Sequence, residues 1–600
     1  MMIDYTEPAA LPPVRAIDLQ TGRLLARLDQ GRCAVLPLAA TLTSWAAGQG
    51  HTCLPLSAVG ALLRDWGMDG SSWENVPALR DRLLDSEVVG GPGGFAPLIL
   101  DGDDKLFLYR YHACEERIAH ALRGRAEHLL PVDADRALPL LDRLFPRNDQ
   151  PGIDWQRAAA VLALYKSLVI ISGGPGTGKT YTVARILALL TGLAPEKLRI
   201  ALVAPTGKAA LRLQESIRLA RTDLPDVAEA LFALQAGTLH RLLGFQGNRP
   251  GFRHNHANLL HLDLVVVDEA SMIDVELMAA LLEALPPRCR IVMLGDRDQL
   301  ASVEAGNLFG DLCGHGDIGW SEPLANTLQP FLGGALPQVA NSRNPLADSL
   351  VLLQTSRRFA PGSGIGALSR AINSGDAEAV SRLLAATWAD VDFFDTAIPN
   401  QTSFMQEQLL AFLEPLFAAD SPEAALQALA GGRILCALRE GPSGVEGINR
   451  LAQRHLLRKR AGASDARPYP GLPILINRND YQLGLFNGDT GILWPDDQGL
   501  FRGWFAQDGG GLRSFSLSRL PAWQPSYAMT VHKSQGSEFD RVLLLLPRED
   551  APVLTRELLY TGMTRARRRL TLCGPQELLL RTTDRQVIRY SGLARKLLLS

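Results

Sequence analysis

The sequence predicts an α/β protein with two parallel-sheet domains in tandem, a mainly helical N-terminal domain and a small β insertion. Short, continuous apolar runs alternate with helical segments from about residue 150 onward, which is typical of parallel sheets covered on both faces. These runs form two groups, at 167–296 and 432–574. A stretch of alternating apolar and polar residues, 473–497, interrupts the second group. At 600 residues, the chain is also too long for one compact core.

Residues 1–140 are predicted to form the N-terminal domain. Short helical patterns, such as 115–130, surround a Gly/Pro-rich stretch at 90–97. This region has no recognisable phosphate loop, nucleophile or cluster of metal ligands. We therefore expect a mainly helical domain that packs against the rest of the chain or contacts a partner.

The two sheet domains are predicted at 141–345 and 346–600. Their expected strands are 167–172, 199–205, 262–268, 290–296, 432–438, 540–547 and 568–574. A polar stretch around a Gly/Pro turn, about 244–261, is expected to form a hairpin insertion in the first domain. The β insertion of the second domain is expected at about 471–525, where "NGD" and "DQG" are turn signals. Segment 306–350 has little periodicity and is expected to be a long loop or linker.

The overall composition is that of an ordinary globular protein, with 46% apolar and 21% charged residues. Lys and Arg total 61 against 63 Asp and Glu, so any nucleic-acid site must be a local groove. The seven cysteines are scattered without metal-ligand spacing and are predicted to be reduced core thiols. Neither a signal peptide nor a membrane-spanning apolar run is present, so we expect a soluble cytoplasmic protein.

A phosphate-binding loop is predicted where "SGGPGTGKTYT" follows one expected strand and precedes a helical segment. Glycines let backbone N–H groups turn toward phosphate oxygens, and the helix N-terminus adds partial positive charge. Lys179 is expected to reach the β and γ phosphates, and the Thr180 hydroxyl to bind Mg²⁺. The predicted nucleotide-binding residues are Gly173, Gly174, Pro175, Gly176, Thr177, Gly178, Lys179, Thr180 and Tyr181.

Further polar residues are expected at the same edge of the sheet. Asp268 and Glu269 end an apolar strand, so Asp268 is predicted to complete the Mg²⁺ shell and Glu269 to orient or deprotonate the attacking water. Gln299 follows the next strand, where an amide can contact the γ-phosphate or the water. Gln156 precedes the first strand and is predicted to pair with an adenine edge.

The stretch "YAMTVHKSQGSEFD", 527–540, brings a hydroxyl, an imidazole, an amine and a carboxylate close together. Such a set suits a nucleophile with its base, the polar start of a helix, or a group of contacts to a charged polymer. No acid that would orient His532 is evident, and the phosphate loop lies elsewhere. We therefore interpret the stretch as contacts to the phosphates and sugars of nucleic acid.

Eight segments in this order resemble the motifs of superfamily 1 helicases of the 5′-to-3′ branch, and most closely the RecD subunits of exodeoxyribonuclease V. They are "GGPGTGKT", "APTGKAA", "TLHRLLG", "VVVDEASM", "LGDRDQL", "SRRF", "MTVHKSQGSEFD" and "LYTGMTRARRRL". They extend from about residue 154 to 570. The N-terminal 140 residues match these subunits in position and size only.

The resemblance implies two RecA-like domains with ATP between them. It implies that Arg565 is the arginine finger and that Arg358 is a second γ-phosphate contact, with the adjacent Arg357 as the open alternative. Gly536 and Glu538 are assigned to the nucleotide side of their motif. The β insertion is expected to be SH3-like and to close over the strand, and the hairpin at 244–261 to split the duplex.

The resemblance also implies a set of DNA contacts. These are Pro205, Thr206, Lys208, Thr238, His240, Asn487, Thr530, His532, Lys533 and Ser534. Residues that grip DNA on one side and sense nucleotide on the other are what a translocating motor requires.

The resemblance implies an ATP- and Mg²⁺-dependent 5′-to-3′ translocase and helicase on single-stranded DNA. It would be the motor subunit of a RecBCD-type helicase-nuclease in double-strand break repair and recombination, acting on duplex ends. RecB-like and RecC-like subunits are the expected partners, and nuclease activity is expected only from a partner. The alternatives are a stand-alone helicase, an ATPase that remodels protein or RNA, and a non-catalytic subunit with a vestigial motor. The intact Lys179, Asp268 and Arg565 argue against the last.

Overall fold

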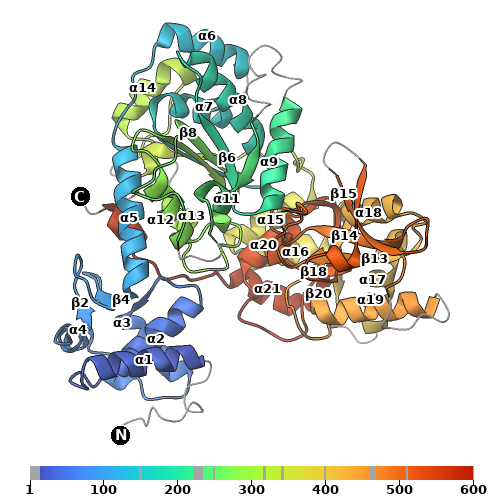
Figure 1. Ribbon diagram of the computed structural model, residues 1–600, viewed down its shortest axis with the longest axis horizontal. Coiled ribbons are helices and arrows are strands. Elements are labelled where there is room, and N and C mark those ends of the chain that lie inside the picture. The colour runs from blue at the N-terminus through green and yellow to red at the C-terminus, as the bar shows by residue number, and fades with distance from the viewer. Residues whose placement is uncertain are drawn as a thin grey trace.

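The computed structural model describes residues 14–147, 152–220, 234–246, 251–314, 319–339, 344–397, 401–459, 468–480, 482–507 and 511–598. Figure 1 shows a small N-terminal body, a first sheet domain above it and a second sheet domain beside both. This arrangement confirms the predicted α/β class.

The N-terminal domain is mainly helical, as predicted, and also contains a small mixed sheet of order β1-β4-β3-β2. Its helices are α1 (Ala16–Leu28), α2 (Leu36–Gly48), α3 (Leu56–Asp65), α4 (Val76–Leu84) and α5 (Tyr109–Ala126), and its strands are β1 (Cys53–Pro55), β2 (Val89–Gly90), β3 (Leu98–Leu100) and β4 (Lys105–Leu108). Strands this short carry no readable periodicity, which explains why the sequence did not predict them. Helix α5 extends into the first sheet domain, where Ile118 and Leu122 pack with Met278 of α12 (Val275–Ala284).

The first sheet domain has six strands in the order β10-β5-β9-β8-β6-β7, all parallel. The strands are β5 (Leu168–Gly173), β6 (Ile200–Ala204), β7 (Ala236–Thr238), β8 (Leu264–Val267), β9 (Arg290–Gly295) and β10 (Leu350–Leu353). The helices, besides α12, are α6 (Ala134–Leu144), α7 (Trp155–Tyr165), α8 (Lys179–Leu193), α9 (Gly207–Leu219), α11 (Leu239–Leu243), α13 (Leu308–Cys313) and α14 (Glu322–Leu332). Two apolar clusters cover the two faces of the sheet, so the strands β5 and β8 are fully buried, whereas the edge strand β7 is partly exposed.

Segment 306–350 is not a long loop, and this prediction is wrong. It contains α13 and α14, and Trp320 is buried in the core. The Ser321 hydroxyl caps α14 by accepting from the Leu324 N–H, and Pro323 stands in the first turn, where proline is tolerated. Strand β10 pairs with β5, so the first sheet extends beyond the expected boundary at 345. The prolines and glycines of this segment interrupt the helical spacing of its apolar residues, so the sequence pattern did not indicate these helices.

The second sheet domain has five parallel strands in the order β11-β20-β19-β12-β18. The strands are β11 (Val391–Asp395), β12 (Gly432–Cys436), β18 (Ala528–Thr530), β19 (Phe539–Leu545) and β20 (Ala566–Gly574), and the helices are α15 (Gly364–Ser374), α16 (Ala377–Ala385), α17 (Gln401–Phe417), α18 (Pro422–Gly431), α19 (Val445–Lys459), α20 (Arg556–Met563) and α21 (Gln576–Asp584).

The β insertion lies where it was predicted and forms an antiparallel sheet of order β16-β15-β14-β13-β17. Its strands are β13 (Leu472–Ile476), β14 (Thr490–Pro495), β15 (Phe501–Ala506), β16 (Leu512–Ser516) and β17 (Trp523–Pro525). Its likeness to an SH3 domain remains a prediction.

The C-terminal segment, 585–598, runs back from the second domain and ends beside α5 in α22 (Leu593–Leu598) (Figure 1). The Tyr590 N–H donates to His51 Nδ1 at 2.9 Å, and Lys596 Nζ lies 2.6 Å from the buried carboxylate of Glu115. A second connection therefore ties the far domain to the N-terminal one.

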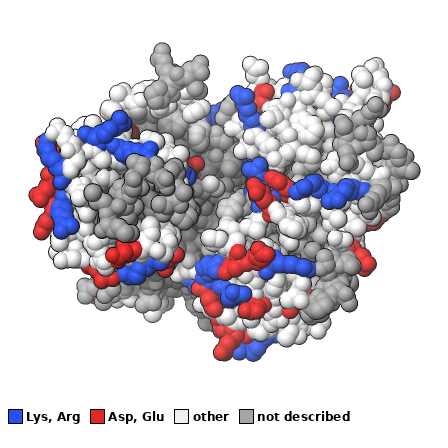
Figure 2. Space-filling model, turned by 90° about the horizontal axis from the view of Figure 1, so that it is seen from below, with Lys and Arg blue, Asp and Glu red and all other residues white. Residues whose placement is uncertain are grey.

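All seven cysteines are free and buried, as predicted. Within the described ranges, no helix has the length and apolar character needed to cross a membrane. Figure 2 shows basic and acidic side chains intermingled on one face, in keeping with the balanced charge.

Candidate nucleotide and nucleic-acid site

The phosphate loop joins β5 to α8 at the carboxyl edge of the first sheet. Gly176 and Gly178 have φ of +77° and +83°, conformations that L side chains rarely adopt. A Cβ at Gly176 would meet the Cβ of Arg358 at 2.3 Å, so the second domain approaches the loop directly. Lys179 Nζ donates to the carbonyl of Gly173 at 2.5 Å, which places the ammonium group within the loop.

Asp268 and Glu269 follow β8 beside this loop. The Glu269 N–H donates to Asp268 Oδ1 at 2.8 Å, and Glu269 has φ of +52°, which is uncommon for a residue other than glycine. Strained backbone of this kind clusters at functional sites. Burial, and then the neighbouring carboxylate of Glu269, raise the pKa of Asp268 above the usual carboxyl range. A cation at this position would relieve that cost.

Gln299 takes part in a buried contact between the two sheet domains. Its Nε2 donates to Asp296 Oδ2 at 2.9 Å, and the same oxygen accepts from the Tyr560 hydroxyl of α20 at 3.0 Å. That hydroxyl also lies close to Gly174 of the phosphate loop, where a Cβ would meet it at 2.8 Å. Tyr560 was not predicted as a site residue, because a tyrosine in a helical pattern is normally a core residue.

The second domain contributes an acid and three arginines. Arg358 Nη2 lies 2.7 Å from one oxygen of Glu538, and Arg567 Nε lies 3.1 Å from the other. Burial acts to raise the pKa of Glu538, but the charges of Arg358 and Arg212 outweigh it and lower this pKa to about 2. Arg565 is buried and donates to the carbonyls of Thr561 and Ser537.

These residues surround one cavity of about 330 Å³ between the two sheet domains. Its lining includes Gly174, Pro175, Gly176, Thr177, Gly178, Lys179, Thr180, Tyr181, Asp268, Glu269, Gln299, Arg358, Glu538 and Arg565 from the predicted set. Arg358 lines the cavity, and its Nη1 is buried with no hydrogen-bond partner among the described residues. This arrangement fits the phosphates of a nucleotide.

Three predicted nucleotide-binding residues do not line the cavity. Gly173 directly precedes Gly174, the first loop residue that lines the cavity. Gly536 packs against Thr206 and Ala209 instead. Gln156 donates to the Thr177 carbonyl at 3.0 Å and accepts from Arg357 at 3.0 Å. Of the two adjacent arginines, only Arg358 lines the cavity, whereas the side chain of Arg357 is exposed.

Sequence reasoning missed a group of lining residues on α9, which are Ala209, Arg212, Glu215, Ser216 and Leu219. Burial lowers the pKa of Arg212, and the carboxylate of Glu538 opposes this shift. Arg212 lies one helical turn after Lys208, which is the only signal that could have pointed to it.

The predicted DNA contacts lie in several places. Thr238 and Thr206 cap α11 and α9 by accepting from the N–H groups of Arg241 and Ala209. His240 packs against two aromatic rings of the hairpin region, Phe245 and Phe252, with centroids 5.9 Å away. The turn of that predicted hairpin, 247–250, lies outside the described residues.

The segment after β18 forms a 3-10 turn at His532–Ser534. Thr530 Oγ1 accepts from the Lys533 N–H, and Lys533 Nζ donates to Asn477 Oδ1 at 3.1 Å. Burial lowers the pKa of His532. Ser534 is fully buried and donates to the Val531 carbonyl, so its hydroxyl is already used within the turn. The DNA role of these residues remains a prediction.

Lys208 and Asn487 lie near the β insertion. Phe486 packs against Gly207, where a Cβ would meet its ring at 2.9 Å, so the turn that carries Asn487 lies against the start of α9. Lys208 lines a second cavity, described below, that borders the insertion. Pro205 precedes this helix and is half-buried.

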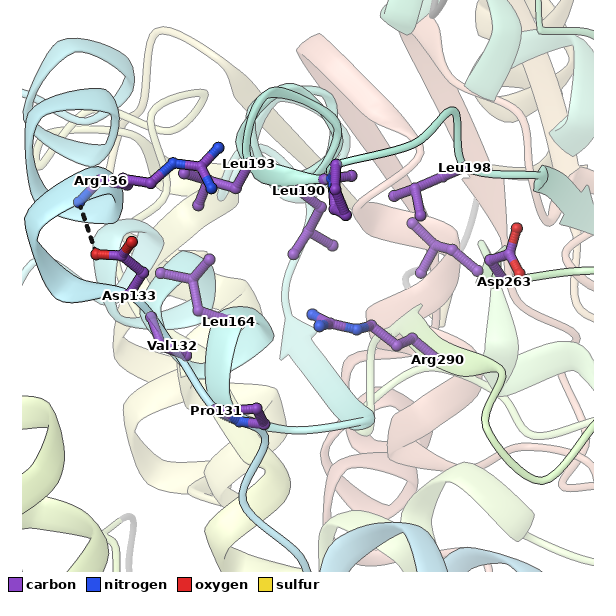
Figure 3. Close-up of a pocket in the computed structure, with 13 residues that line it drawn as sticks. Pro131, Val132, Asp133, Arg136, Leu164, Leu190, Leu193, Leu198, Asp263 and Arg290 are labelled. Atoms are coloured by element: carbon purple, nitrogen blue, oxygen red, sulfur yellow. Dashed lines mark hydrogen bonds between the residues drawn. The ribbon is translucent and has the colours of Figure 1, made fainter.

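Figure 3 shows a separate cavity of about 320 Å³ at the amino ends of β8 and β9. Leucines of α7 and α8 line it, and the guanidinium groups of Arg136 and Arg290 reach toward it. It lies at the opposite end of the sheet from the phosphate loop.

Three family models match the chain: the N-terminal domain of RecBCD enzyme subunit RecD at 12–107, an AAA domain at 156–305 and a UvrD-like helicase C-terminal domain at 525–573. The chain is 37% identical over 589 residues to "RecBCD enzyme subunit RecD" of Mycolicibacterium smegmatis, covering 97% of each chain. It is 29% identical to "ATP-dependent RecD2 DNA helicase" of Deinococcus radiodurans, covering 79% of this chain and 56% of that one. A solved structure of Pif1 helicases at forked DNA aligns with 72% of this chain and 94% of that chain, with 16% identity and a TM-score of 0.37.

Two parallel-sheet domains that meet at one cavity beside the phosphate loop, with a UvrD-like helicase C-terminal domain in the second, define an ATP-dependent DNA helicase. The identity to RecD extends over nearly the whole of both chains, including the N-terminal domain. The chain therefore belongs to the RecD family of RecBCD enzyme subunits.

Proposed function

We propose that this chain is a 5′-to-3′ motor on single-stranded DNA and works as a subunit of a RecBCD-type helicase-nuclease in double-strand break repair and recombination. The observation that carries the proposal is the cavity that the phosphate loop of the first sheet domain and the arginines of the second line together. Hydrolysis there can be coupled to movement, because closing the cavity moves one domain against the other. The direction of movement comes from the family resemblance alone.

The first domain supplies the groups that bind and hydrolyse the nucleotide. The loop N–H groups and Lys179 would hold the β and γ phosphates, and Glu269 would orient the attacking water. Thr180 and Asp268 would hold Mg²⁺, with the remaining ligands from phosphate and water, as is usual for this ion. Bound Mg²⁺ neutralises charge on the phosphates. Gln156, Gly173 and Gly536 support the site from outside the cavity.

The second domain supplies cations. Arg565 and Arg358 reach the same cavity, and guanidinium groups suit the charge that develops on a transferring phosphoryl group. Glu538 binds Arg358 and Arg567 at once, and so holds Arg358 at the wall of the cavity. A change in the charge of the bound nucleotide would act on Arg358, and through its ion pair with Glu538 on the segment that starts at Thr530.

A direct hydrogen-bond path supports coupling between nucleotide and strand. Gln535 Nε2 donates to the Leu300 carbonyl at 3.0 Å, and the Leu300 N–H donates to Thr561 Oγ1 at 2.9 Å. Leu300 is adjacent to Gln299 of the nucleotide cavity. Gln535, which directly follows the turn at 530–534, therefore bonds to the sequence neighbour of a residue that lines the cavity. We propose that Thr530, His532, Lys533 and Ser534, together with Pro205, Thr206, Lys208, Thr238, His240 and Asn487, make up the DNA-binding set.

We also propose RecB-like and RecC-like partners, which would supply the nuclease. Coverage supports a subunit over a stand-alone helicase, because the chain spans 97% of the RecD relative but 56% of the RecD2 relative. Co-purification from native extract tests this, and a chain that purifies alone and unwinds duplex ends would favour the stand-alone alternative.

The experiment that tests the motor is Lys179→Gln. The variant keeps most of the length of the side chain but loses the charge, and DNA-stimulated ATP hydrolysis should disappear. Retention of the single-strand-binding affinity would show that the fold is intact. Normal turnover in this variant would refute the assigned site.

A further inference from the structure

A second cavity, of about 650 Å³, adjoins the nucleotide cavity. It lies between α9, α18, β12 and the β insertion, and Arg212, Glu215 and Glu538 line both cavities. The two are therefore neighbours that share one wall. None of the roles described above for the nucleotide requires this space.

Cationic groups from three elements converge on it, namely Lys208 and Arg212 of α9, Arg433 of β12 and Arg513 of β16. Arg433 is only 1% exposed, and Arg513 fixes a turn by donating to the carbonyls of Leu483 and Gly484. The Nε of each of these two arginines is buried without a hydrogen-bond partner in the part of the chain that the structure describes. A buried donor without a partner is costly, and an anion in the cavity would offset the positive charge of these two guanidinium groups.

The acids that line the cavity offset these cations only in part, since the carboxylates of Asp489 and Glu538 act to raise the pKa of Lys208 and of Arg212, and burial still lowers both. Glu538 is bound by Arg358 and Arg567, Asp489 accepts from the Phe486 N–H, and Glu215 is exposed to solvent. Burial, and then the charges of Arg433 and Arg212, lower the pKa of Lys208 to about 7. Burial lowers the pKa of Arg433 to about 9. The cavity is thus an environment that disfavours its own cations and favours an anion.

We propose that this cavity binds a phosphate oxyanion, and that during turnover its ligand is the inorganic phosphate leaving the adjoining nucleotide cavity. The inference rests on the proposed ATP hydrolysis. Donors that approach from three elements suit a free phosphate, which offers four oxygens, better than a DNA phosphodiester, which offers two unbridged ones. The shared wall gives the product a direct way in, past Arg212.

A binding experiment tests the site without any hydrolysis. The whole chain is saturated with a non-hydrolysable ATP analogue and Mg²⁺, so that the nucleotide cavity is filled, and inorganic phosphate is titrated at constant ionic strength by calorimetry. Ala430 of α18 is exposed and lines the second cavity, so Ala430→Glu adds a negative charge there and removes no contact. We expect phosphate binding to wild type and about tenfold weaker binding to Ala430→Glu. The neutral control, Ala430→Gln, should stay within about twofold of wild type.

A kinetic experiment separates phosphate release from chemistry. In single turnovers, acid quench reports the cleavage step and a fluorescent phosphate sensor reports release. Ala430→Glu should change release by severalfold and leave cleavage unchanged. Phosphate that fails to bind the analogue-filled wild type, or equal binding by both Ala430 variants, would overturn the proposal. A tenfold loss of affinity for single-stranded DNA in Ala430→Glu alone, with phosphate binding intact, would assign the cavity to the strand instead. Absence of hydrolysis in wild type would count against the proposed function and leave the binding result standing.

Discussion

The ion pair between Lys596 and Glu115 anchors the C-terminal segment on the N-terminal domain. Glu115 is fully buried and accepts from Lys596 Nζ at 2.6 Å, from Thr52 Oγ1 at 2.6 Å and from the Gly592 N–H at 3.2 Å. Lys596→Met keeps most of the apolar stem but leaves the carboxylate buried without a cation. Breaking a buried pair in this way costs about 3–5 kcal/mol, and the remaining donors favour the lower value of about 3 kcal/mol.

The neighbouring residue provides a matched control. Arg595 lies on the same helix as Lys596 and pairs with Asp103 of the N-terminal domain. Its side chain is half exposed, so Arg595→Met should cost less than about 1 kcal/mol. Both variants change one cation of α22 to methionine. The two ion pairs differ in burial, because Lys596 and Glu115 are both buried, whereas Arg595 is half exposed and Asp103 is partly exposed.

Amide hydrogen exchange is the appropriate assay, because a chain of several domains does not unfold in one step and local opening is measured residue by residue. For α22 and the adjoining part of α5, Lys596→Met should speed exchange about a hundredfold, which corresponds to about 3 kcal/mol. Arg595→Met should change it by less than about fivefold. Adding Glu115→Gln to Lys596→Met should recover part of the loss, since no buried charge is then left unpaired. Equal acceleration in the two single variants would refute this reasoning.

Three further predictions concern the nucleotide cavity and the C-terminal segment. Arg358→Ala should lower DNA-stimulated ATP hydrolysis about a thousandfold, whereas Arg357→Ala, outside the cavity, should lower it by less than about tenfold; similar losses would contradict the assignment. Tyr560→Phe removes the hydroxyl that donates to Asp296 and should weaken nucleotide binding severalfold, or about 1 kcal/mol, by titration; unchanged affinity would exclude a role for this contact. Burial, and then the charge of the nearby Arg589, lower the pKa of His51 from 6.5 to about 4, so the fold favours the neutral ring. Docking of the C-terminal segment should therefore be complete above pH 6.5 and weaken by up to roughly 3 kcal/mol as pH falls to 4, seen as loss of protection at the Tyr590 amide in wild type but not in His51→Gln.

The phosphate loop and the acidic strand end were predictable because their chemistry lies within a few consecutive residues. Gly173 to Thr180 form one strand–loop–helix unit, and Asp268 and Glu269 end an apolar strand of the same sheet. The parallel strands were predictable for the same reason, since burial on both faces leaves a continuous apolar run. Helix α14 was missed because its prolines lie at positions that a helix tolerates only in particular turns.

Residues at the contact between domains could not be chosen from local patterns, and Arg358, Glu538 and Arg565 were assigned only through the family resemblance. Arg357 and Arg358 are adjacent and chemically identical, and the packing of their segment on the phosphate loop turns only Arg358 into the cavity. Tyr560 meets Asp296 across 264 residues of sequence, and Lys596 meets Glu115 across 481. A local sequence pattern cannot predict such pairs, because the two residues come into contact only when two distant parts of the chain pack together. Local sequence was therefore sufficient to predict the phosphate loop and the acidic strand end, whereas the contacts that join one domain to another arise only from tertiary packing.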